Sequence, residues 1–521
     1  MSHHKRRALM QPNSAGVSPL FLTRRAGVLL HPTSLPNQTS FSRERPVAQL
    51  HGTLGRDAYV FVDFLAESGI SVWQMLPTGP THADLSPYQS VSAHAGNPDL
   101  ISIDWFIDQQ WVAPAEEWYQ AVADKESLQQ IRIDCANQFY ELVSQERGAE
   151  LRHKLGHFCE DNQYWLDDYV LFMALRKHYG NRSWSEWPEA LKKRSPEALQ
   201  ELREFLALDI SLYLFEQFAY FEQWNQLRRY AFEKNIVLFG DMPIFVAHDS
   251  ADVWAAQEFF NLDEQGNALT VAGVPPDYFS ETGQHWGNPH YNWEAMEASG
   301  FSWWLARFRT QLKQFDLIRI DHFRGFEAFW SIPGDSQDAR SGQWVKAPGE
   351  AFLKACFAAY PSLPLVAENL GLITPEVEAL RHQFNLPGML VLQFAFDGNR
   401  KNPHLPHNHR QSDVIYTGTH DNDTSLGWYQ ALSDEHKAIT QEYLFSSRES
   451  IPWLLIDAAL ASVSPMAIIP LQDILELDGA HRMNVPGTTG TNWTWQFSWL
   501  QFPQELSHRL KTHLTRYDRL S

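Results

Sequence analysis

The sequence predicts a single (β/α)8 barrel that carries large, mostly helical insertions. Eight short runs of apolar, β-branched or aromatic residues follow one another along the chain, and segments with helical periodicity lie between most of them. Continuous apolar runs separated by helices indicate parallel strands that are covered on both faces. A doubly wound open sheet is the alternative. It is less favoured because no glycine-rich phosphate loop follows the first run.

The predicted strands and helices alternate in a regular order. Helical periodicity is clear over residues 59–68, which Gly69 closes, and over residues 302–314, where Trp304 and Phe308 share one stripe. Residues 374–384 open with a Thr-Pro-Glu sequence, which is typical of a helix N-terminus. The eight predicted strands are residues 26–31, 71–77, 236–245, 316–322, 363–370, 389–396, 414–420 and 465–471.

The spacing of the predicted strands is uneven, which indicates insertions into the barrel. The stretch between the second and third strands holds strong helical patterns over residues 164–179 and 212–234. We therefore expect an inserted helical subdomain roughly within residues 105–210. Loop insertions are expected near 262–293, which is rich in Gly, Pro and aromatic residues, and near 397–413. Residues 1–24 are expected to form an N-terminal tail, and residues 25–521 a single catalytic barrel.

The charge balance excludes several classes of partner. The chain has 42 Lys and Arg against 62 Asp and Glu, a formal net charge of −20. Nucleic acids are bound mainly through positive charge, so no nucleic-acid partner is expected, and the same argument disfavours anionic membranes and acidic polysaccharides. Neutral ligands remain. The 20 Trp fit a sugar binder, because pyranose faces stack on aromatic rings, although core packing is the commoner role of any one Trp.

The cysteines and the hydropathy pattern bear on location. Cys135, Cys159 and Cys356 lie far apart and follow no metal-binding spacing, which is typical of reduced thiols in a cytoplasmic protein. No apolar run is long enough to cross a membrane, and the basic N-terminus lacks the apolar region of a secretory signal. The sequence therefore predicts a cytoplasmic protein without a membrane partner.

Four acidic residues fall at or near the ends of predicted strands. Asp241 lies within the third, Asp321 and Glu368 lie near the ends of the fourth and fifth, and Asp421 comes one residue after the seventh. Catalytic residues of barrels come from the carboxyl ends of several strands, so these acids should converge on one mouth. Any one of them has an ordinary alternative as a helix cap or a buried ion pair. The four together favour a site.

Two of these carboxylates suffice for retaining glycoside chemistry, in which one attacks the anomeric carbon and the other protonates the leaving oxygen. Their separation should be about 5–5.5 Å. Arg319 and Asp321 are two apart and point to the same side of a strand, and a nearby cation favours an ionised nucleophile. A structural Arg–Asp pair is the alternative. Apolar neighbours before Glu368 would favour the protonated form that a general acid needs.

Long sequence motifs connect the chain to a known family. It resembles the 4-α-glucanotransferases, also called amylomaltases or disproportionating enzymes, which form glycoside hydrolase family 77 of the α-amylase superfamily. The resemblance runs from about Arg25 to Phe497. The motifs include Gly27-Val-Leu-Leu-His-Pro-Thr-Ser-Leu-Pro36, Gly240-Asp-Met-Pro-Ile-Phe-Val246, Arg319-Ile-Asp-His-Phe-Arg-Gly325, Ala367-Glu-Asn-Leu-Gly371, Tyr416-Thr-Gly-Thr-His-Asp-Asn-Asp-Thr424 and Asn492-Trp-Thr-Trp495.

The resemblance implies a role for each matching residue. Asp321 would be the nucleophile, Glu368 the acid/base and Asp421 the transition-state stabiliser. Tyr278 and Phe279 would lie on a flexible loop over the bound chain. Asn369 stands where the family often has Asp, which bears on acceptor contacts. The substrate-binding residues implied are Arg319, His322, His420, Asp241, Ser86, Tyr88, Asp277, Tyr278, Phe279, Trp286, Asn369, Asn484 and Asn492.

The family fold implies no cofactor and no metal ion. His404, His407 and His409 have the composition of a metal site, but they fit the family's long loop after the sixth strand. The implied partners are maltooligosaccharides and other α-1,4-glucans such as starch and glycogen, with glucose as an acceptor. A monomer or weak oligomer is expected.

The expected activity is transfer of a glucan segment to the 4-hydroxyl of another glucan or of glucose, through a covalent glycosyl-enzyme. An α-1,4-glucan hydrolase is the alternative, because both enzymes form the same intermediate and the residues separate them only weakly. A non-catalytic glucan-binding barrel is disfavoured because all three acids are present. A barrel acting on sugar phosphates is disfavoured by the acidic segment His420–Asp423 near strand seven.

Overall fold

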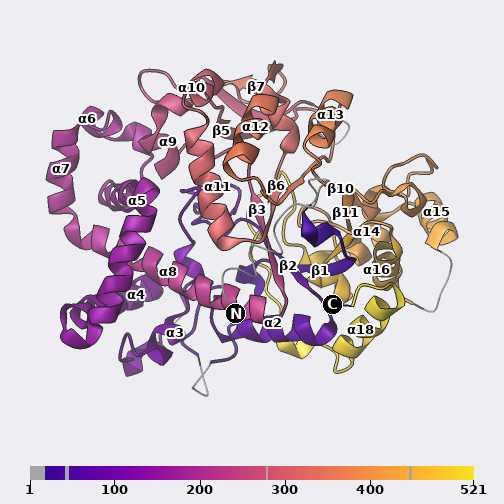
Figure 1. The fold of residues 1–521 in the computed structure, drawn as a ribbon, viewed down its shortest axis with the longest axis horizontal. Helices are drawn as coiled ribbons and strands as arrows, with labels where there is room; N and C mark the ends of the chain where they lie inside the picture. The colour runs from indigo at the N-terminus through magenta and orange to yellow at the C-terminus, as the bar shows by residue number, and fades with distance from the viewer. Residues whose placement is uncertain (1–17, 41–45, 122, 277–279, 445–448, 521) are drawn as a thin grey trace.

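The computed structural model describes residues 18–40, 46–121, 123–276, 280–444 and 449–520. Eight parallel strands form one sheet in the order β10-β11-β12-β1-β2-β3-β6-β9. The two edge strands meet, because the Ala367 N–H donates to the Pro387 carbonyl at 2.8 Å. The sheet is therefore a closed barrel, and the predicted fold class is confirmed (Figure 1). The strands are β1 (Arg25–Leu29), β2 (Val72–Gln74), β3 (Val237–Met242), β6 (Leu317–Ile320), β9 (Leu365–Ala367), β10 (Gly388–Val391), β11 (Asp413–Tyr416) and β12 (Met466–Pro470).

Side chains fill the inside of the barrel. Neighbours two apart on one strand, such as Val414 and Tyr416, or Met466 and Ile468, belong to the same buried cluster, because alternate residues of a strand face the same side. Leu29, Phe239 and other strand residues complete this cluster. The interior is thus a packed core rather than a channel, and substrate can approach only from an end.

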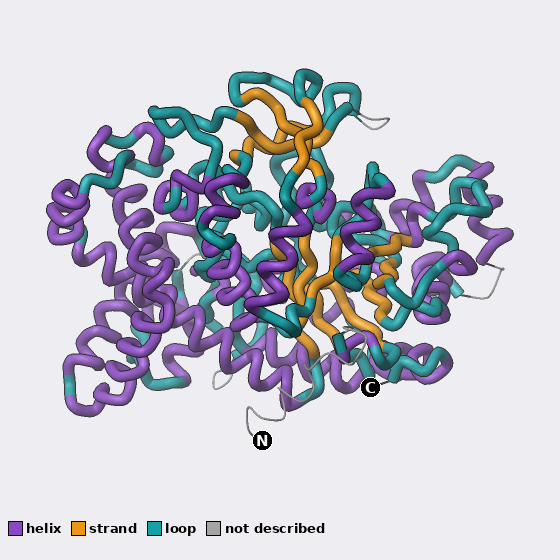
Figure 2. The backbone as a smooth tube through the Cα atoms, turned by 45° about the horizontal axis from the view of Figure 1, so that its top comes forward, coloured by secondary structure: helices purple, strands orange, loops and turns teal. Residues whose placement is uncertain are grey.

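Helices cover the outside of the barrel, as Figure 2 shows. Between β10 and β11 the chain forms only the short 3-10 turns η9 (Leu392–Phe394) and η10 (Pro406–Asn408), so this connection lacks an α-helix. The helices that follow the barrel strands are α2 (Arg56–Ser68), α8 (Ala207–Glu233), α9 (Ala251–Ala255), α10 (Trp293–Ala298), α11 (Ser302–Gln314), α12 (Gly349–Ala359), α13 (Pro375–Gln383), α14 (Ser425–Ala431), α15 (Asp434–Leu444), α16 (Ile451–Ala461), α17 (Leu471–Ile474) and α18 (Leu506–Arg516).

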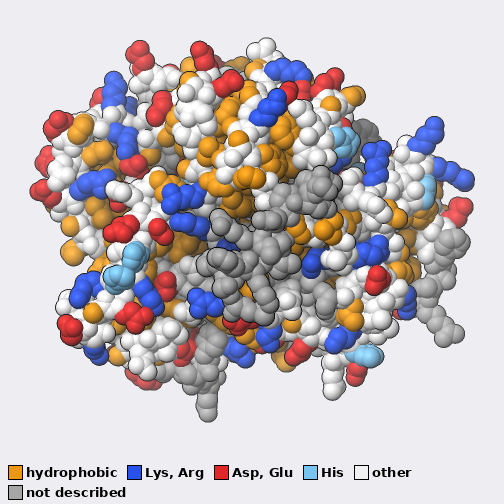
Figure 3. Space-filling model, viewed as in Figure 1, with side chains coloured by type: hydrophobic (Ala, Val, Ile, Leu, Met, Phe, Trp, Pro, Cys, Tyr) orange, Lys and Arg blue, Asp and Glu red, His pale blue; other side chains and the backbone are white. Residues whose placement is uncertain are grey.

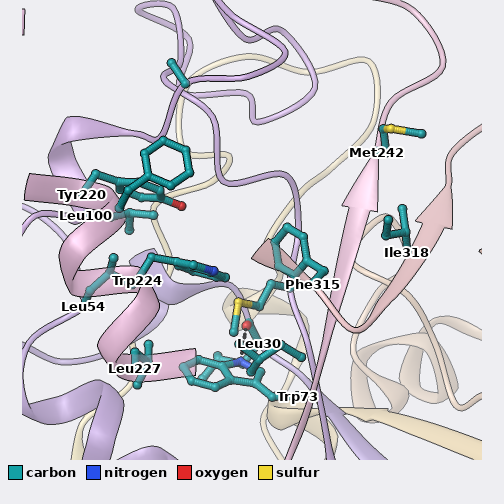
Figure 4. Packing of buried hydrophobic residues seen from close by; sticks show 14 of the residues in the cluster. Leu30, Leu54, Trp73, Leu100, Tyr220, Trp224, Leu227, Met242, Phe315 and Ile318 are labelled. Atoms are coloured by element: carbon teal, nitrogen blue, oxygen red, sulfur yellow. Dashed lines mark hydrogen bonds between the residues drawn. The ribbon is translucent and has the colours of Figure 1, made fainter. Parts of the chain in front are cut away.

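Aromatic side chains join the helices to the barrel (Figure 4). Trp224 of α8 stacks on Tyr220, donates its indole N–H to the Gln314 carbonyl and meets the Phe315 ring edge-on. The Phe315 ring also covers Gly240 of β3, where a Cβ would lie 2.4 Å from the ring. Only glycine therefore fits beside the next residue, Asp241.

The long stretch between β2 and β3 is helical, and it lies on the left in Figure 1. Its longest helix, α5, packs against α8 and begins far before the predicted residues 164–179. The early turns of α5 are largely solvent-exposed and polar, so their apolar periodicity is weak. The helices of this stretch before α8 are α3 (Ile103–Asp108), α4 (Lys125–Ser144), α5 (Ala149–His178), α6 (Glu189–Lys192) and α7 (Pro196–Phe205).

A second sheet stands over one edge of the barrel, at the top of Figure 2. It is antiparallel, with the order β5-β4-β7-β8, and its strands are β4 (Thr270–Val274), β5 (Gln284–Pro289), β7 (Ala328–Pro333) and β8 (Gln343–Lys346). Two of these strands lie in the segment near 262–293 that was expected to be loop. The difference arises because β4 pairs with β7, which follows β6 and is far away in the sequence. A pattern of neighbouring residues does not predict such a pairing.

The described surface mixes both signs of charge. Acidic and basic side chains are interspersed over the face in Figure 3. Among the residues that the structure describes, no helix has the length and apolarity needed to span a bilayer.

Candidate active site

A cavity of about 1110 Å³ lies at the carboxyl end of the barrel. Its walls come from the segments that follow seven of the eight barrel strands, together with β5 of the second sheet. This is the end at which barrel enzymes bind their substrates. The predicted residues that line it are Ser86, Tyr88, Trp286, Arg319, Asp321, His322, Glu368, Asp421, Asn484 and Asn492.

Arg319 of β6 organises the carboxylates on one side of the cavity. Its guanidinium donates to Asp321 Oδ1 at 2.9 Å and to Asp241 Oδ2 at 2.6 Å. The Tyr88 hydroxyl donates to the same Asp241 oxygen at 2.7 Å. Arg319 is buried, whereas the Asp321 side chain remains 29% exposed. Asp321 is therefore held in orientation by a charged hydrogen bond while one side stays open to the cavity.

Glu368 directly follows β9 and is held by backbone groups. Its two oxygens accept the N–H groups of His322 and Leu370, each at 2.7 Å. His322 adopts a left-handed conformation with φ of 51°, an unusual backbone state for a non-glycine residue. The turn at His322 places that N–H against Glu368, so the segment after β6 carries Asp321 and also positions the carboxyl of the next strand.

Burial raises the pKa of both Asp321 and Glu368. For Glu368 a raised pKa is the direction that a general acid requires. The effect of burial outweighs Arg319 and the two backbone N–H groups, which lower the pKa. For Asp321 the sequence predicted that Arg319 would favour the ionised form. Arg319 does act in that direction, but burial and the neighbouring carboxyls outweigh one guanidinium, so the pKa of Asp321 is raised overall. The structure thus places both pKa values above their ordinary range.

Asp421 has a different environment. Burial raises its pKa, but His420 and the Asn484 amide, which donates to Oδ1 at 2.6 Å, together lower it to about 2. Burial lowers the pKa of His420, but Asp421 at 3.2 Å raises it above its ordinary value. The Tyr88 ring stacks on His420 with centroids 5.1 Å apart. Asp421 therefore remains a carboxylate at any neutral pH and faces the cavity as a fixed negative charge.

The structure places several predicted residues outside the cavity wall. Asp241 and His420 are buried behind it, where they support Arg319 and Asp421. Asn369 points elsewhere, contrary to its expected acceptor contact. Its amide donates to Glu378 and accepts the Met389 N–H, each at 2.8 Å, so it ties α13 to β10. Asp277, Tyr278 and Phe279 lie outside the described residues.

Other residues line the cavity without having been predicted. Gln393 and Phe394 follow β10, and the rule that sites form at strand ends, applied to the sixth strand, would have found them. Trp493, which lies within a family motif, and His404, which the sequence places in the loop after the sixth strand, also line the cavity. The Nδ1 of His404 accepts the Val391 N–H at 3.0 Å, which fixes the neutral tautomer with the proton on Nε2.

No group of three or more metal-ligating side chains occurs in the part of the chain that the structure describes. The nitrogens of His407 contact Tyr443 and the Arg400 carbonyl, and those of His409 contact Ser462 and the His404 carbonyl. The rings of His407 and His409 therefore hold the segment between β10 and β11 in place through hydrogen bonds.

Comparisons with known proteins agree with this geometry. A family model described as 4-alpha-glucanotransferase matches residues 30–501. The chain is 45% identical to a 4-alpha-glucanotransferase of Thermus thermophilus over 93% of this chain and 96% of that protein. It is 41% identical to a chloroplastic/amyloplastic 4-alpha-glucanotransferase of Solanum tuberosum, over 91% and 82%. Among solved structures, an amylomaltase from Streptococcus agalactiae in complex with acarbose matches with a TM-score of 0.89 and 36% identity, covering 96% of this chain and 100% of that one.

Proposed function

This chain belongs to the 4-alpha-glucanotransferase family, and from that premise we propose that Asp321 is its nucleophile, Glu368 its general acid and base, and Asp421 the stabiliser of its transition state. The enzyme transfers segments of α-1,4-glucans by a retaining mechanism. The observation that supports the three roles is that these carboxyls, which come from the ends of three different strands, line one cavity.

The first half of the reaction forms a covalent intermediate. The Asp321 carboxylate attacks the anomeric carbon, the bond from that carbon to the glycosidic oxygen breaks, and Glu368 gives its proton to the departing oxygen. Positive charge develops on the sugar ring in this step. Asp421 stabilises that charge because its own pKa of about 2 keeps it ionised throughout.

The second half reverses the first with a different partner. Glu368, now a carboxylate, takes the proton from the 4-hydroxyl of an acceptor sugar, whose oxygen attacks the anomeric carbon and releases Asp321. Burial raises the pKa of Glu368 in this structure, which favours return of the proton after each cycle. Two inversions at the same carbon retain the α configuration.

We propose neutral α-1,4-glucans as both donor and acceptor: maltooligosaccharides, starch and glycogen as donors, and glucose as the smallest acceptor. Support comes from the size of the cavity, from its mixture of aromatic walls and hydrogen-bonding groups, and from the acarbose complex of the Streptococcus agalactiae relative. The Trp286 indole lies edge-on to His322 at one wall and offers a face for a pyranose ring.

We also propose the organisation and location of the enzyme. Residues 25–521 would act as one catalytic barrel, with the helices between β2 and β3 as an inserted subdomain and the segments near 262–293 and 397–413 as active-site insertions. Three cysteines without disulfide partners support a cytoplasmic location. A monomer or weak oligomer is proposed.

Incubation with maltotriose alone tests the proposal. Product lengths and total reducing ends are followed together on the purified enzyme. A ladder of shorter and longer maltooligosaccharides with constant reducing ends is expected. A rise in reducing ends with only shorter products would replace the transferase by a hydrolase that uses the same carboxyls, and an inert folded protein would overturn the proposed roles.

A further inference from the structure

A second, small cavity lies behind the active site. Its volume is about 40 Å³, and Tyr88, Pro243 and Phe245 line both cavities and so form the wall between them. The polar side chains around it include Thr78, Ser92, Asp241, Arg307, Gln311 and Gln314. Asp241 lies within β3, and Arg307, Gln311 and Gln314 belong to α11.

Three buried polar atoms around this cavity have no hydrogen-bond partner within the described ranges: Asp241 Oδ1, Arg307 Nε and Gln311 Oε1. The remaining polar atoms of Asp241 and Arg307 are occupied. Asp241 Oδ2 accepts from Arg319 and Tyr88, and the terminal nitrogens of Arg307 donate to the carbonyls of Pro243 and Ile244. Buried polar groups in native proteins are almost always satisfied by protein or by ordered water.

The unpaired atoms match the hydrogen-bonding capacity of one water molecule. Arg307 Nε is a donor, and Asp241 Oδ1 and Gln311 Oε1 are acceptors, whereas water accepts through its oxygen and donates two hydrogens. A polar cavity of this size has room for water. A cation is disfavoured by the Arg307 guanidinium, and an anion by the Asp241 carboxylate.

We propose that this cavity binds an ordered water molecule, which accepts from Arg307 Nε and donates to Asp241 Oδ1 and Gln311 Oε1, and that Arg307 and Gln311 are positioning residues for the active site. They act through a chain of contacts. The water orients the Asp241 carboxylate, which holds the Arg319 guanidinium at 2.6 Å, and Arg319 in turn holds Asp321 at 2.9 Å. The positioning role rests on the proposed function of Asp321, whereas the water site does not.

Two measurements test the two parts separately. A crystal structure of the full chain at a resolution that shows ordered water should contain density within hydrogen-bonding distance of all three atoms. Absence of that density overturns the water site, whatever the activity of the enzyme.

Gln311→Met and Gln311→Glu then test positioning. Methionine has a similar length but cannot accept a strong hydrogen bond, so kcat on maltotriose should fall about threefold to tenfold with KM unchanged. Glutamate keeps an acceptor oxygen and should retain more of kcat than methionine. Gln383→Met, on the outer helix α13, is the matched control. Density for the water together with an unchanged kcat in Gln311→Met would overturn the positioning role, and failure of wild-type transfer would instead count against the proposed function.

Discussion

The two ends of the barrel use buried charge in opposite ways. At the amino end of the strands, the Arg519 guanidinium is fully buried and donates to the carbonyls of Arg25, Leu460, Ser462, Ser464 and Pro465. At the carboxyl end, Arg319 lies between two carboxylates, and a third acid, Glu368, lies close enough to act on its charge.

This difference separates stability from function. The cation at the amino end binds neutral backbone groups, and it ties the C-terminus to β1 and to the turn before β12. At the carboxyl end several carboxyls repel one another, and burial raises the pKa of Asp321 and of Glu368, the proposed nucleophile and acid. A buried cluster of like charges costs stability, and such clusters are typical of catalytic sites. Removing charge should therefore abolish activity at the carboxyl end and lower the free energy of unfolding at the amino end.

Asp321→Asn should have the largest effect on activity. The amide has nearly the same shape but cannot form the glycosyl-enzyme, so transfer should fall by about 10⁴-fold. The melting temperature should stay equal or rise, because a carboxylate with a raised pKa destabilises the fold at neutral pH. Initial rates on maltotriose and thermal melts measure both. Asp338→Asn, in an exposed pair with Arg340, is the control, and normal turnover by folded Asp321→Asn would remove Asp321 as nucleophile.

Glu368→Gln should reduce transfer from natural glucans by about 10²- to 10⁴-fold, because the leaving oxygen loses its proton donor. Activity on an α-glucosyl fluoride donor should fall much less, since fluoride leaves without protonation. The ratio of the two rates is the measurement. Equal losses on both donors would contradict the acid role.

Arg519→Met should leave kcat unchanged and lower the free energy of unfolding by about 3 kcal/mol, because several buried carbonyls lose their donor. Denaturant titration measures the loss. Arg516→Met, in a more exposed pair with Asp457, should cost less than about 0.5 kcal/mol. A similar small effect of both variants would show that the amino end does not depend on Arg519.

Acidification should stop catalysis before it unfolds the protein. As the proposed nucleophile, Asp321 must be ionised, and its pKa is raised. As the pH decreases, kcat/KM should therefore begin to fall at a pH well above the ordinary Asp pKa of about 3.9. Asp421 has a lowered pKa, so its contribution to stability is complete above that ordinary value and is lost only as the pH falls towards about 2. Rate profiles and circular dichroism on the same samples test this, and simultaneous loss of rate and fold would refute it.

Much of the site was predictable from local sequence. Each of the eight predicted strands overlaps a barrel strand, and Asp321, Glu368 and Asp421 could be placed because the ends of parallel strands meet at one mouth. The surroundings of the individual side chains were less predictable. Asp241 carries the same strand-end signal as the other acids, yet it lines the small cavity behind the site, and the Asn369 amide is hydrogen-bonded to Glu378 and Met389.

The sequence by itself determined the alternation of eight strands with helices and the position of acidic residues at strand ends, because apolar runs and strand ends are local properties of the chain. The tertiary structure alone decided the pairing of β4 with β7, the burial that raises the pKa of Asp321 and the unpaired atoms behind Asp241. These features depend on contacts between segments far apart in the chain, and burial and hydrogen-bond satisfaction follow from those contacts rather than from neighbours in sequence.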